Sequence, residues 1–196
     1  MNKQNQLNEL EILRLLDEIE EITRYFTHNK KSFNNLTAIK RENYINIMIG
    51  NLKHTYSDIY KSVRKSLEID DYYMKLNLIA DCILFLQNSC KTLSNYMGSK
   101  YQYVLNNDDL EIRKIRNNLI GHPLDRLGDP EKGGKLLSHI HYAHTQFPFY
   151  KYISYEYINH ETNEYEYIEE YFDIYFLSIS SLNNIYSFLK KIKNNI

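Results

Sequence analysis

The sequence has little of what several familiar classes of protein need. Among 196 residues it has two cysteines, Cys82 and Cys90, and its formal net charge is −1. The two cysteines fall eight residues apart in one expected helix, too far apart to form a disulfide, so we expect two reduced thiols. A net charge near zero excludes a global field that attracts nucleic acid. Any RNA contact would therefore need a local positive patch, or one assembled in a dimer.

Long apolar runs and several catalytic motifs are also missing. The chain begins without a signal-peptide pattern. Its longest apolar run, residues 76–86, is interrupted by Asn77 and Asp81 and is too short to span a bilayer. We therefore expect a cytoplasmic protein with no membrane contact. The sequence also shows no glycine-rich phosphate loop, no Ser or Cys triad and no zinc-ligand cluster, which leaves those classes of enzyme without support.

The spacing of the apolar residues predicts a mainly α fold. Five apolar residues in 7–26 recur at intervals of three and four, which is typical of a helix with one buried stripe: Ile12, Leu15, Ile19, Ile22 and Phe26. Similar spacing predicts further helices over residues 37–67, 70–97 and 173–192, and the apolar residues expected in the last of these are Leu177, Leu182, Ile185, Leu189 and Ile192. Residues 76–86 are apolar nearly all round, so this helix should be the most buried. The polar stretch 29–35 is expected to be a loop.

Helix and strand signals complete the expected architecture. Asp108 followed by Glu111 resembles a capping box and predicts a fourth helix, which Gly121 and Pro123 would end. Residues 149–158 and 164–172 alternate and are dense in tyrosine, which predicts a β-hairpin. We expect one domain over residues 1–196. It would be a four- to five-helix up-and-down bundle with one β-hairpin, about 149–172, inserted before the last helix.

Asp81 lies inside the most apolar predicted helix, where a carboxylate needs a partner. One interpretation is a structural pair with an arginine or a tyrosine. The other is an auxiliary functional role, as an active-site acid or as the group that orients Arg116. The sequence leaves both open.

The segment 112–126, IRKIRNNLIGHPLDR, carries the strongest chemical signal. Histidine transfers protons near neutral pH, and arginine neutralises charge that develops on a phosphate. Cleavage of RNA by transesterification needs a base, an acid and positive charge, so Arg116 and His122 supply half of the set and a symmetric dimer would supply the rest. On a straight helix these two residues lie about 120° apart around the axis. Either the helix end unwinds, or the site is shared across a dimer.

RNNLIGHP resembles the R-x4–6-H motif of the HEPN superfamily (higher eukaryotes and prokaryotes nucleotide-binding), in which a polar residue often follows the arginine. The resemblance implies that Arg116 and His122 are catalytic and that Asn117 positions the site. It implies a metal-independent endoribonuclease without a cofactor, acting as a homodimer in toxin–antitoxin, abortive-infection or antiviral defence. Its partners would be RNA, a second copy of the chain and an antitoxin or defence-system protein. Its products would end in a 2′,3′-cyclic phosphate.

The segment departs from one part of the family pattern. HEPN toxins controlled by nucleotidyltransferase antitoxins often carry a tyrosine two residues after the histidine, as a modification site. Leu124 occupies that position here, which argues against control of that type. A simpler interpretation of the whole segment also stays open. Arg116 would pair with Asp81 or Glu111, and His122 would only cap the helix C-terminus.

Two further groups of residues are candidates for RNA contact. Arg113, Lys114 and Arg126 form the best local phosphate-binding patch, although a solvated helix face would have the same composition. His139 is a possible auxiliary RNA contact. Together with His141 on a strand it could bind a metal, but the absence of nearby ligands favours a packed or exposed histidine without metal.

A different class of function stays open because the predicted hairpin is acidic. Its second strand carries four glutamates that would repel phosphate: Glu164, Glu166, Glu169 and Glu170. The alternative is therefore a non-catalytic helical module that binds a protein or nucleotide partner through the tyrosine-rich acidic hairpin.

Overall fold

The structure, a computed structural model, describes residues 3–36, 50, 72–117, 135–141, 149–159 and 164–196. These residues form five helices and three strands: α1 (Lys3–His28), α2 (Lys30–Asn35), α4 (Tyr72–Met97), α5 (Asn107–Ile115), β1 (Lys135–His141), β2 (Phe149–Asn159), β3 (Glu164–Asp173) and α6 (Ile174–Lys193). The predicted fold class, a mainly helical bundle with a β insertion before its last helix, is confirmed. The helix expected over 37–67 lies outside the described residues.

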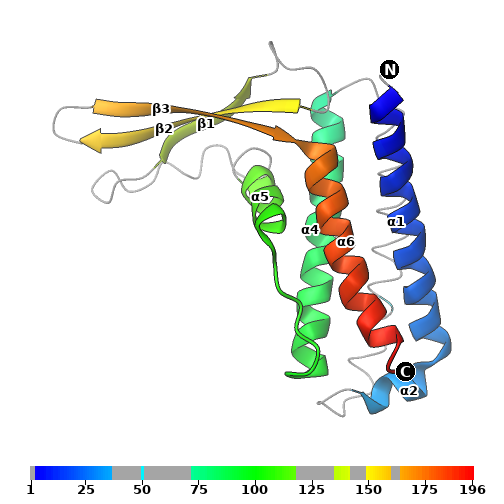
Figure 1. Ribbon diagram of the computed structural model, residues 1–196. Coiled ribbons are helices and arrows are strands. Elements are labelled where there is room, and N and C mark those ends of the chain that lie inside the picture. Colours follow the sequence, from blue (N-terminus) through cyan, green and yellow to red (C-terminus); the bar gives the residue numbers. More distant parts are fainter. Residues whose placement is uncertain (1–2, 37–49, 51–71, 118–134, 142–148, 160–163) are drawn as a thin grey trace.

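The long helices pack side by side, and the sheet projects from one end of the bundle (Figure 1). Helices α1, α4 and α6 run in the same direction, and α5 runs in the opposite direction beside α4. In the part of the chain that the structure describes, no helix combines the length and the apolar character needed to cross a membrane.

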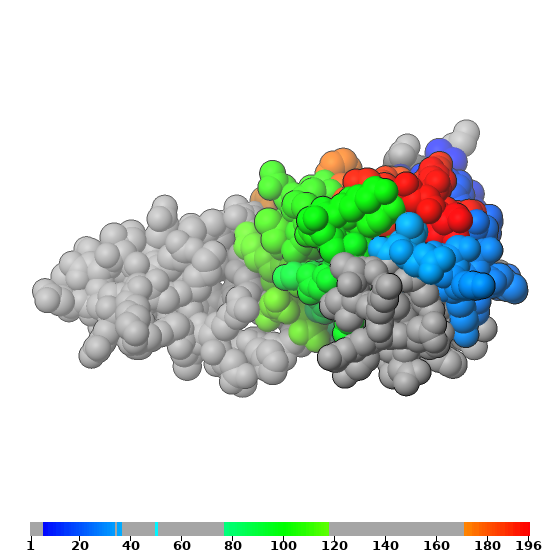
Figure 2. Space-filling model, turned by 90° about the horizontal axis from the view of Figure 1, so that it is seen from below, coloured from blue at the N-terminus to red at the C-terminus, as the bar shows by residue number. Residues whose placement is uncertain are grey.

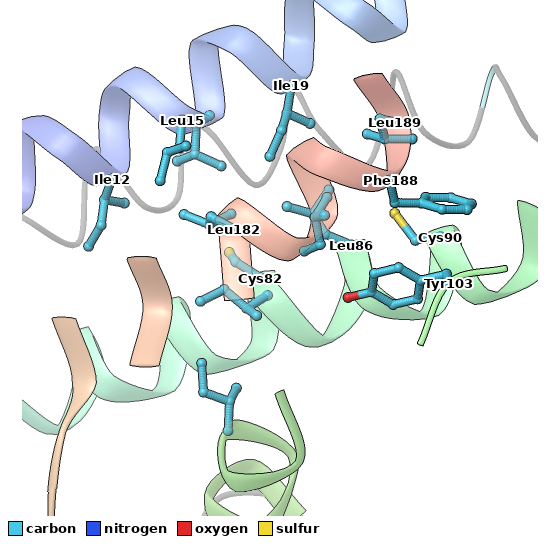
Figure 3. Packing of buried hydrophobic residues seen from close by; sticks show 14 of the residues in the cluster. Ile12, Leu15, Ile19, Cys82, Leu86, Cys90, Tyr103, Leu182, Phe188 and Leu189 are labelled. Carbon is cyan, nitrogen blue, oxygen red and sulfur yellow. The ribbon is translucent and has the colours of Figure 1, made fainter. Parts of the chain in front are cut away.

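One core joins α1, α4 and α6. Figure 3 shows Ile12, Leu15 and Ile19 of α1 facing α6, while Cys82, Leu86 and Cys90 of α4 close the other side. The predicted stripes of α1 and α6 are confirmed, because every one of their members is buried: Ile12, Leu15, Ile19, Ile22 and Phe26 in α1, and Leu177, Leu182, Ile185, Leu189 and Ile192 in α6.

Helix α4 was expected to be the most buried helix, but it is amphipathic and one of its sides faces solvent. Ile79, Ile83 and Leu86 are almost fully buried, but Phe85 is 57% exposed and the Asp81 side chain is 37% exposed. One side of α4 packs into the core, and the other side carries Asp81 and Phe85 toward solvent.

Residues 29–35 contain a short helix where the sequence predicted a loop. Phe33 is fully buried, and its ring lies 4.9 Å from the ring of Phe26. The backbone bonds Asn29 N to Tyr25 O (3.0 Å) and Phe33 N to Asn29 O (2.9 Å) carry helical bonding across the junction of α1 and α2. Seen from below, α2 lies against the C-terminal end of α6 (Figure 2). Burial of the Phe33 ring therefore stabilises a helix in a segment whose other residues are polar.

The predicted hairpin is confirmed to within one residue at its ends, and the structure adds a strand. The three strands form an antiparallel sheet in the order β1-β2-β3. Strand β1, which the sequence did not predict, pairs with β2 from Lys135↔Glu156 to His141↔Lys151.

The sheet joins the bundle without an intervening loop. Asp173 is the last residue of β3, and its Oδ1 accepts hydrogen bonds from the backbone N–H groups of Tyr175 (2.9 Å) and Phe176 (3.1 Å) at the start of α6. An aspartate in this position satisfies donors that a helix start otherwise leaves unpaired.

We predict that Phe33→Ala lowers the free energy of unfolding by about 3 kcal/mol, because it removes a fully buried ring and leaves a cavity beside Phe26. Urea denaturation followed by circular dichroism measures the change. Phe176→Ala is the matched control, because Phe176 is 62% exposed and its removal should change stability by less than about 0.5 kcal/mol. Equal losses in the two variants would show that α2 is not part of the core.

Candidate functional site

Helix α5 begins with a capping box. Asn106 is extended, with φ −85° and ψ 179°, and its side chain accepts a hydrogen bond from Asp109 N at 2.8 Å. In return, Asp109 Oδ2 accepts from Asn106 N at 2.9 Å. The box predicted at Asp108 and Glu111 was therefore placed two residues too late. Asp108 lies in the first turn instead, where its carboxylate accepts a hydrogen bond from Ser180 of α6.

Asp109 also ties α5 to the two helices beside it. Its side chain is fully buried. Its Oδ1 accepts from Gln87 Nε2 of α4 at 3.0 Å, and its Oδ2 accepts from the side-chain amide of Asn184 of α6. The other end of the Gln87 amide, Oε1, accepts from Arg113 Nε at 2.7 Å. A buried carboxylate is tolerated where several donors satisfy it, and these contacts supply them.

Arg116 lies at the opposite end of α5 and pairs with Asp81 of α4. Its Nε lies 2.8 Å from Asp81 Oδ1, and its Nη1 makes a longer contact of 3.4 Å with Asn117 Oδ1. The sequence left Asp81 and Glu111 open as partners of Arg116. The structure selects Asp81, since Glu111 pairs with Lys114 Nζ at 3.5 Å.

The backbone changes at this point. The α-helix ends at Ile115, and Arg116 and Asn117 have π-helical backbone. Turns of the π-helix are rare in proteins as a whole, and many of those that occur lie at functional sites. The Arg116 side chain is 30% exposed, and its guanidinium is held by Asp81 through Nε. An anion bound to Arg116 would compete with Asp81 for the positive charge of the guanidinium.

The RNA-contact candidates on α5 are engaged within the protein. The guanidinium of Arg113 faces α4, where Nε donates to Gln87 and Nη2 donates to Asn88 Oδ1 at 2.6 Å. Lys114 pairs with Glu111 within the same helix. A role in binding RNA stays a prediction for both residues.

The described structure does not test the remaining candidates as members of this site. His122 and Arg126 lie outside the described residues. His139 stands in β1 opposite Ile153 of β2. Within the described ranges, no group of three His, Cys, Asp or Glu side chains is placed to hold a metal ion. The expectation of a reaction without metal or cofactor stays a prediction.

Both cysteine thiols are structural. Burial raises the pKa of Cys82 to about 12, with a smaller contribution from the neighbouring charge of Asp81. Burial also raises the pKa of Cys90, again with a smaller contribution from a carboxylate, that of Asp109. Both groups are neutral thiols near pH 7, so neither is an effective nucleophile there.

Sequence reasoning missed Gln87, Asp109 and Asn184. Gln87 stands on the buried stripe of α4 between Ile83 and Cys90, and it is fully buried itself. A polar side chain in that position needs partners, as Asp81 was expected to need one. That signal was present in the sequence and identifies Gln87. It does not identify the partners, which come from other helices.

Comparison of the chain with family models, with curated proteins and with solved structures finds no match in any of the three.

We predict that Asp81→Asn lowers the free energy of unfolding by about 0.5–1 kcal/mol, because both partners of the ion pair are about one-third exposed and water screens their attraction. Thermal or urea denaturation measures this loss. Glu20→Gln is the matched control, because it removes the exposed pair of Glu20 with Arg24 on α1 and should cost a similar amount. A loss above about 3 kcal/mol for Asp81→Asn alone would mean that the pair behaves as a buried one.

Proposed function

We propose that this protein is a metal-independent endoribonuclease of the HEPN type, acting as a homodimer in bacterial toxin–antitoxin or antiphage defence. The observation that carries the proposal is the ion pair of Arg116 with Asp81. It holds the guanidinium of a partly exposed side chain at the end of a short helix, in the segment whose sequence resembles the HEPN motif. The helical bundle around it supports the same proposal.

The proposed reaction is a transesterification of RNA. A histidine base takes the proton of the 2′-hydroxyl, the 2′-oxygen bonds to phosphorus and the bond to the 5′-oxygen breaks. A histidine acid protonates that leaving oxygen. The products are a 2′,3′-cyclic phosphate and a 5′-hydroxyl. Each chain has one His122, so the second copy supplies the other proton-transfer group.

Arg116 stabilises the negative charge that develops on the phosphorane. Asn117 positions the site, and Arg113, Lys114 and Arg126 are the nearest candidates for contacts to flanking phosphates. Asp81 fixes the direction of the guanidinium through Nε, Asn117 contacts Nη1, and the remaining donors of the group are assigned to the phosphate. The partner outside the dimer would be an antitoxin or another protein of the defence system.

We predict that the wild-type protein cleaves RNA in the presence of EDTA and that His122→Ala lowers kcat by about 10²–10⁴-fold, because it removes the proton-transfer group. Arg116→Ala should cause a similar loss. Gel analysis of a labelled oligoribonucleotide measures cleavage, and mass spectrometry identifies the cyclic phosphate. Arg14→Ala is the matched control for Arg116→Ala, because Arg14 is an exposed arginine paired on α1 and its removal should leave kcat unchanged.

The same assay tests the dimer. An equal mixture of wild-type and His122→Ala chains, exchanged through dissociation, should show about a quarter of the wild-type activity at the same total concentration and not half, because a mixed dimer holds one His122 and lacks the second proton-transfer group. Equal activity of wild type and His122→Ala would contradict the proposal. A strictly monomeric protein in gel filtration, or products that end in a 3′-hydroxyl, would contradict it as well.

A second candidate function is supported by a groove at the foot of the sheet. The groove has a volume of about 450 Å³, and two of its walls are the exposed aromatic side chains Tyr171 and Phe176. The groove is lined by Glu111, Tyr171, Phe172, Asp173, Phe176 and Leu177. Its two carboxylates disfavour a phosphate, and its exposed aromatic side chains favour a protein partner. The candidate is a non-catalytic module that binds a protein through this acidic, aromatic surface.

We predict for this alternative that the product of the adjacent gene binds the protein, that binding survives His122→Ala and that it is lost when residues 149–172 are deleted. Phe176→Ala should weaken binding about tenfold or more, because exposed aromatic side chains supply much of the energy of such contacts. Calorimetry measures the affinity. Leu10→Ala, at an exposed apolar residue of α1, is the control, and undiminished binding by the deletion variant would count against this function.

A further inference from the structure

Helices α4 and α5 are joined by two groups of polar contacts along their length: Gln87 and Asn88 bond to Asp109 and Arg113, and Asp81 bonds to Arg116. Gln87 meets Asp109 at the start of α5, and Asp81 meets Arg116 at its end. The two contacts are separated by six residues on α4 and seven on α5, which corresponds to about 9 Å and about 10.5 Å along the axes. Because the helices are antiparallel and the two spacings nearly match, both contacts form together only in one axial position of α5 on α4.

The amide of Gln87 enforces that position through two unlike partners. Its Nε2 donates to the buried Asp109 carboxylate at 3.0 Å, and its Oε1 accepts from Arg113 Nε at 2.7 Å. Turning the amide over would set donor against donor at Arg113 and acceptor against acceptor at Asp109. A shift of α5 by one residue would break both bonds and leave a buried charge short of a donor, which costs more than most surface contacts can offset.

We infer that Gln87 is a positioning residue. By bridging Asp109 and Arg113 it sets the position of α5 on α4, and so it places the Arg116 guanidinium against Asp81. The effect on cleavage rests on the proposed function, whereas the effect on Arg116 does not. This role engages Arg113 with Gln87, so the contacts to flanking phosphates proposed above fall to Lys114 and Arg126.

Single substitutions in the bridge, which is formed by Gln87, Asp109 and Arg113, should displace the Arg116 guanidinium. Gln87→Glu sets a second carboxylate against Asp109, and Asp109→Asn sets donor against donor in either orientation of its amide. We predict that each variant lowers kcat about 10²-fold with little change in KM, because the guanidinium moves while the RNA contacts stay. Gln102→Glu is the matched control, because Gln102 is exposed and bonds only to Gly98 O, at 2.9 Å, in the described contacts.

Exchanging the two groups should restore the site. In the double variant Gln87→Glu with Asp109→Asn, the introduced asparagine can donate to one oxygen of the introduced glutamate, while its own oxygen still accepts from Asn106 N and Asn184. The other oxygen of the glutamate accepts from Arg113. Every hydrogen bond of the bridge is retained with the amide and the carboxylate exchanged. The double variant should therefore regain kcat to within about threefold of wild type, a non-additive result.

A second readout follows Arg116 directly and does not need activity. The Nε–H signal of Arg116, identified by its loss in Arg116→Lys, is measured by ¹H–¹⁵N NMR. Its hydrogen exchange should be about tenfold faster in each single variant than in wild type, and slow again in the double variant. If a single variant does not fold, Asn184→Ala takes its place, with its exposed neighbour Asn183→Ala as control.

The outcomes separate the two proposals. If wild type cleaves no RNA, the proposed function fails, and the exchange of Arg116 still tests the bridge. If wild type cleaves RNA but the double variant stays as slow as the single variants, the bridge has no positioning role. Unchanged kcat and unchanged Arg116 exchange in Gln87→Glu would overturn the inference as well.

Discussion

The arrangement of the helices around the candidate site depends on one buried carboxylate. Asp109 has no access to water, so protein groups must supply all of its hydrogen bonds. They come from three places: the start of its own helix, Gln87 of α4 and Asn184 of α6. A helix of nine residues is too short to be stable by itself, and this anchoring compensates for its length. The location of Arg116 is therefore a consequence of where Asp109 is buried.

The parts of the fold that the sequence predicted are those controlled by apolar spacing. The stripes of α1 and α6 were predicted residue by residue, because a helix that buries one face must repeat its apolar residues at that period. The failures have another cause. Helix α2 depends on a tertiary contact of Phe33, and the capping box depends on which aspartate the neighbouring helices bury. Neither contact is encoded in a local window of the sequence, and β1 is specified by its pairing with β2 in the same way.

The candidate site was predicted in part for the same reason. An arginine partner for Asp81 was predicted from its place in an apolar helix, and the structure supplies Arg116, although the Asp81 side chain is 37% exposed. The choice between Arg116 and other partners could not be made without the antiparallel packing of α4 and α5. The pair also has a cost for phosphate chemistry, since the carboxylate competes for the guanidinium. It is compatible with catalysis where orientation matters more than net charge, because a fixed donor needs no reorganisation as charge develops.

Because β3 joins α6 directly at Asp173, the sheet and the start of α6 should move together. No loop separates the strand from the helix, so a tilt of the sheet would be transmitted to the first turns of α6. Those turns are followed by Ser180 and Asn184, which hold Asp108 and Asp109 of α5. A molecule that tilts the sheet would therefore displace α5, the helix that ends at Arg116, through its hydrogen bonds to α6.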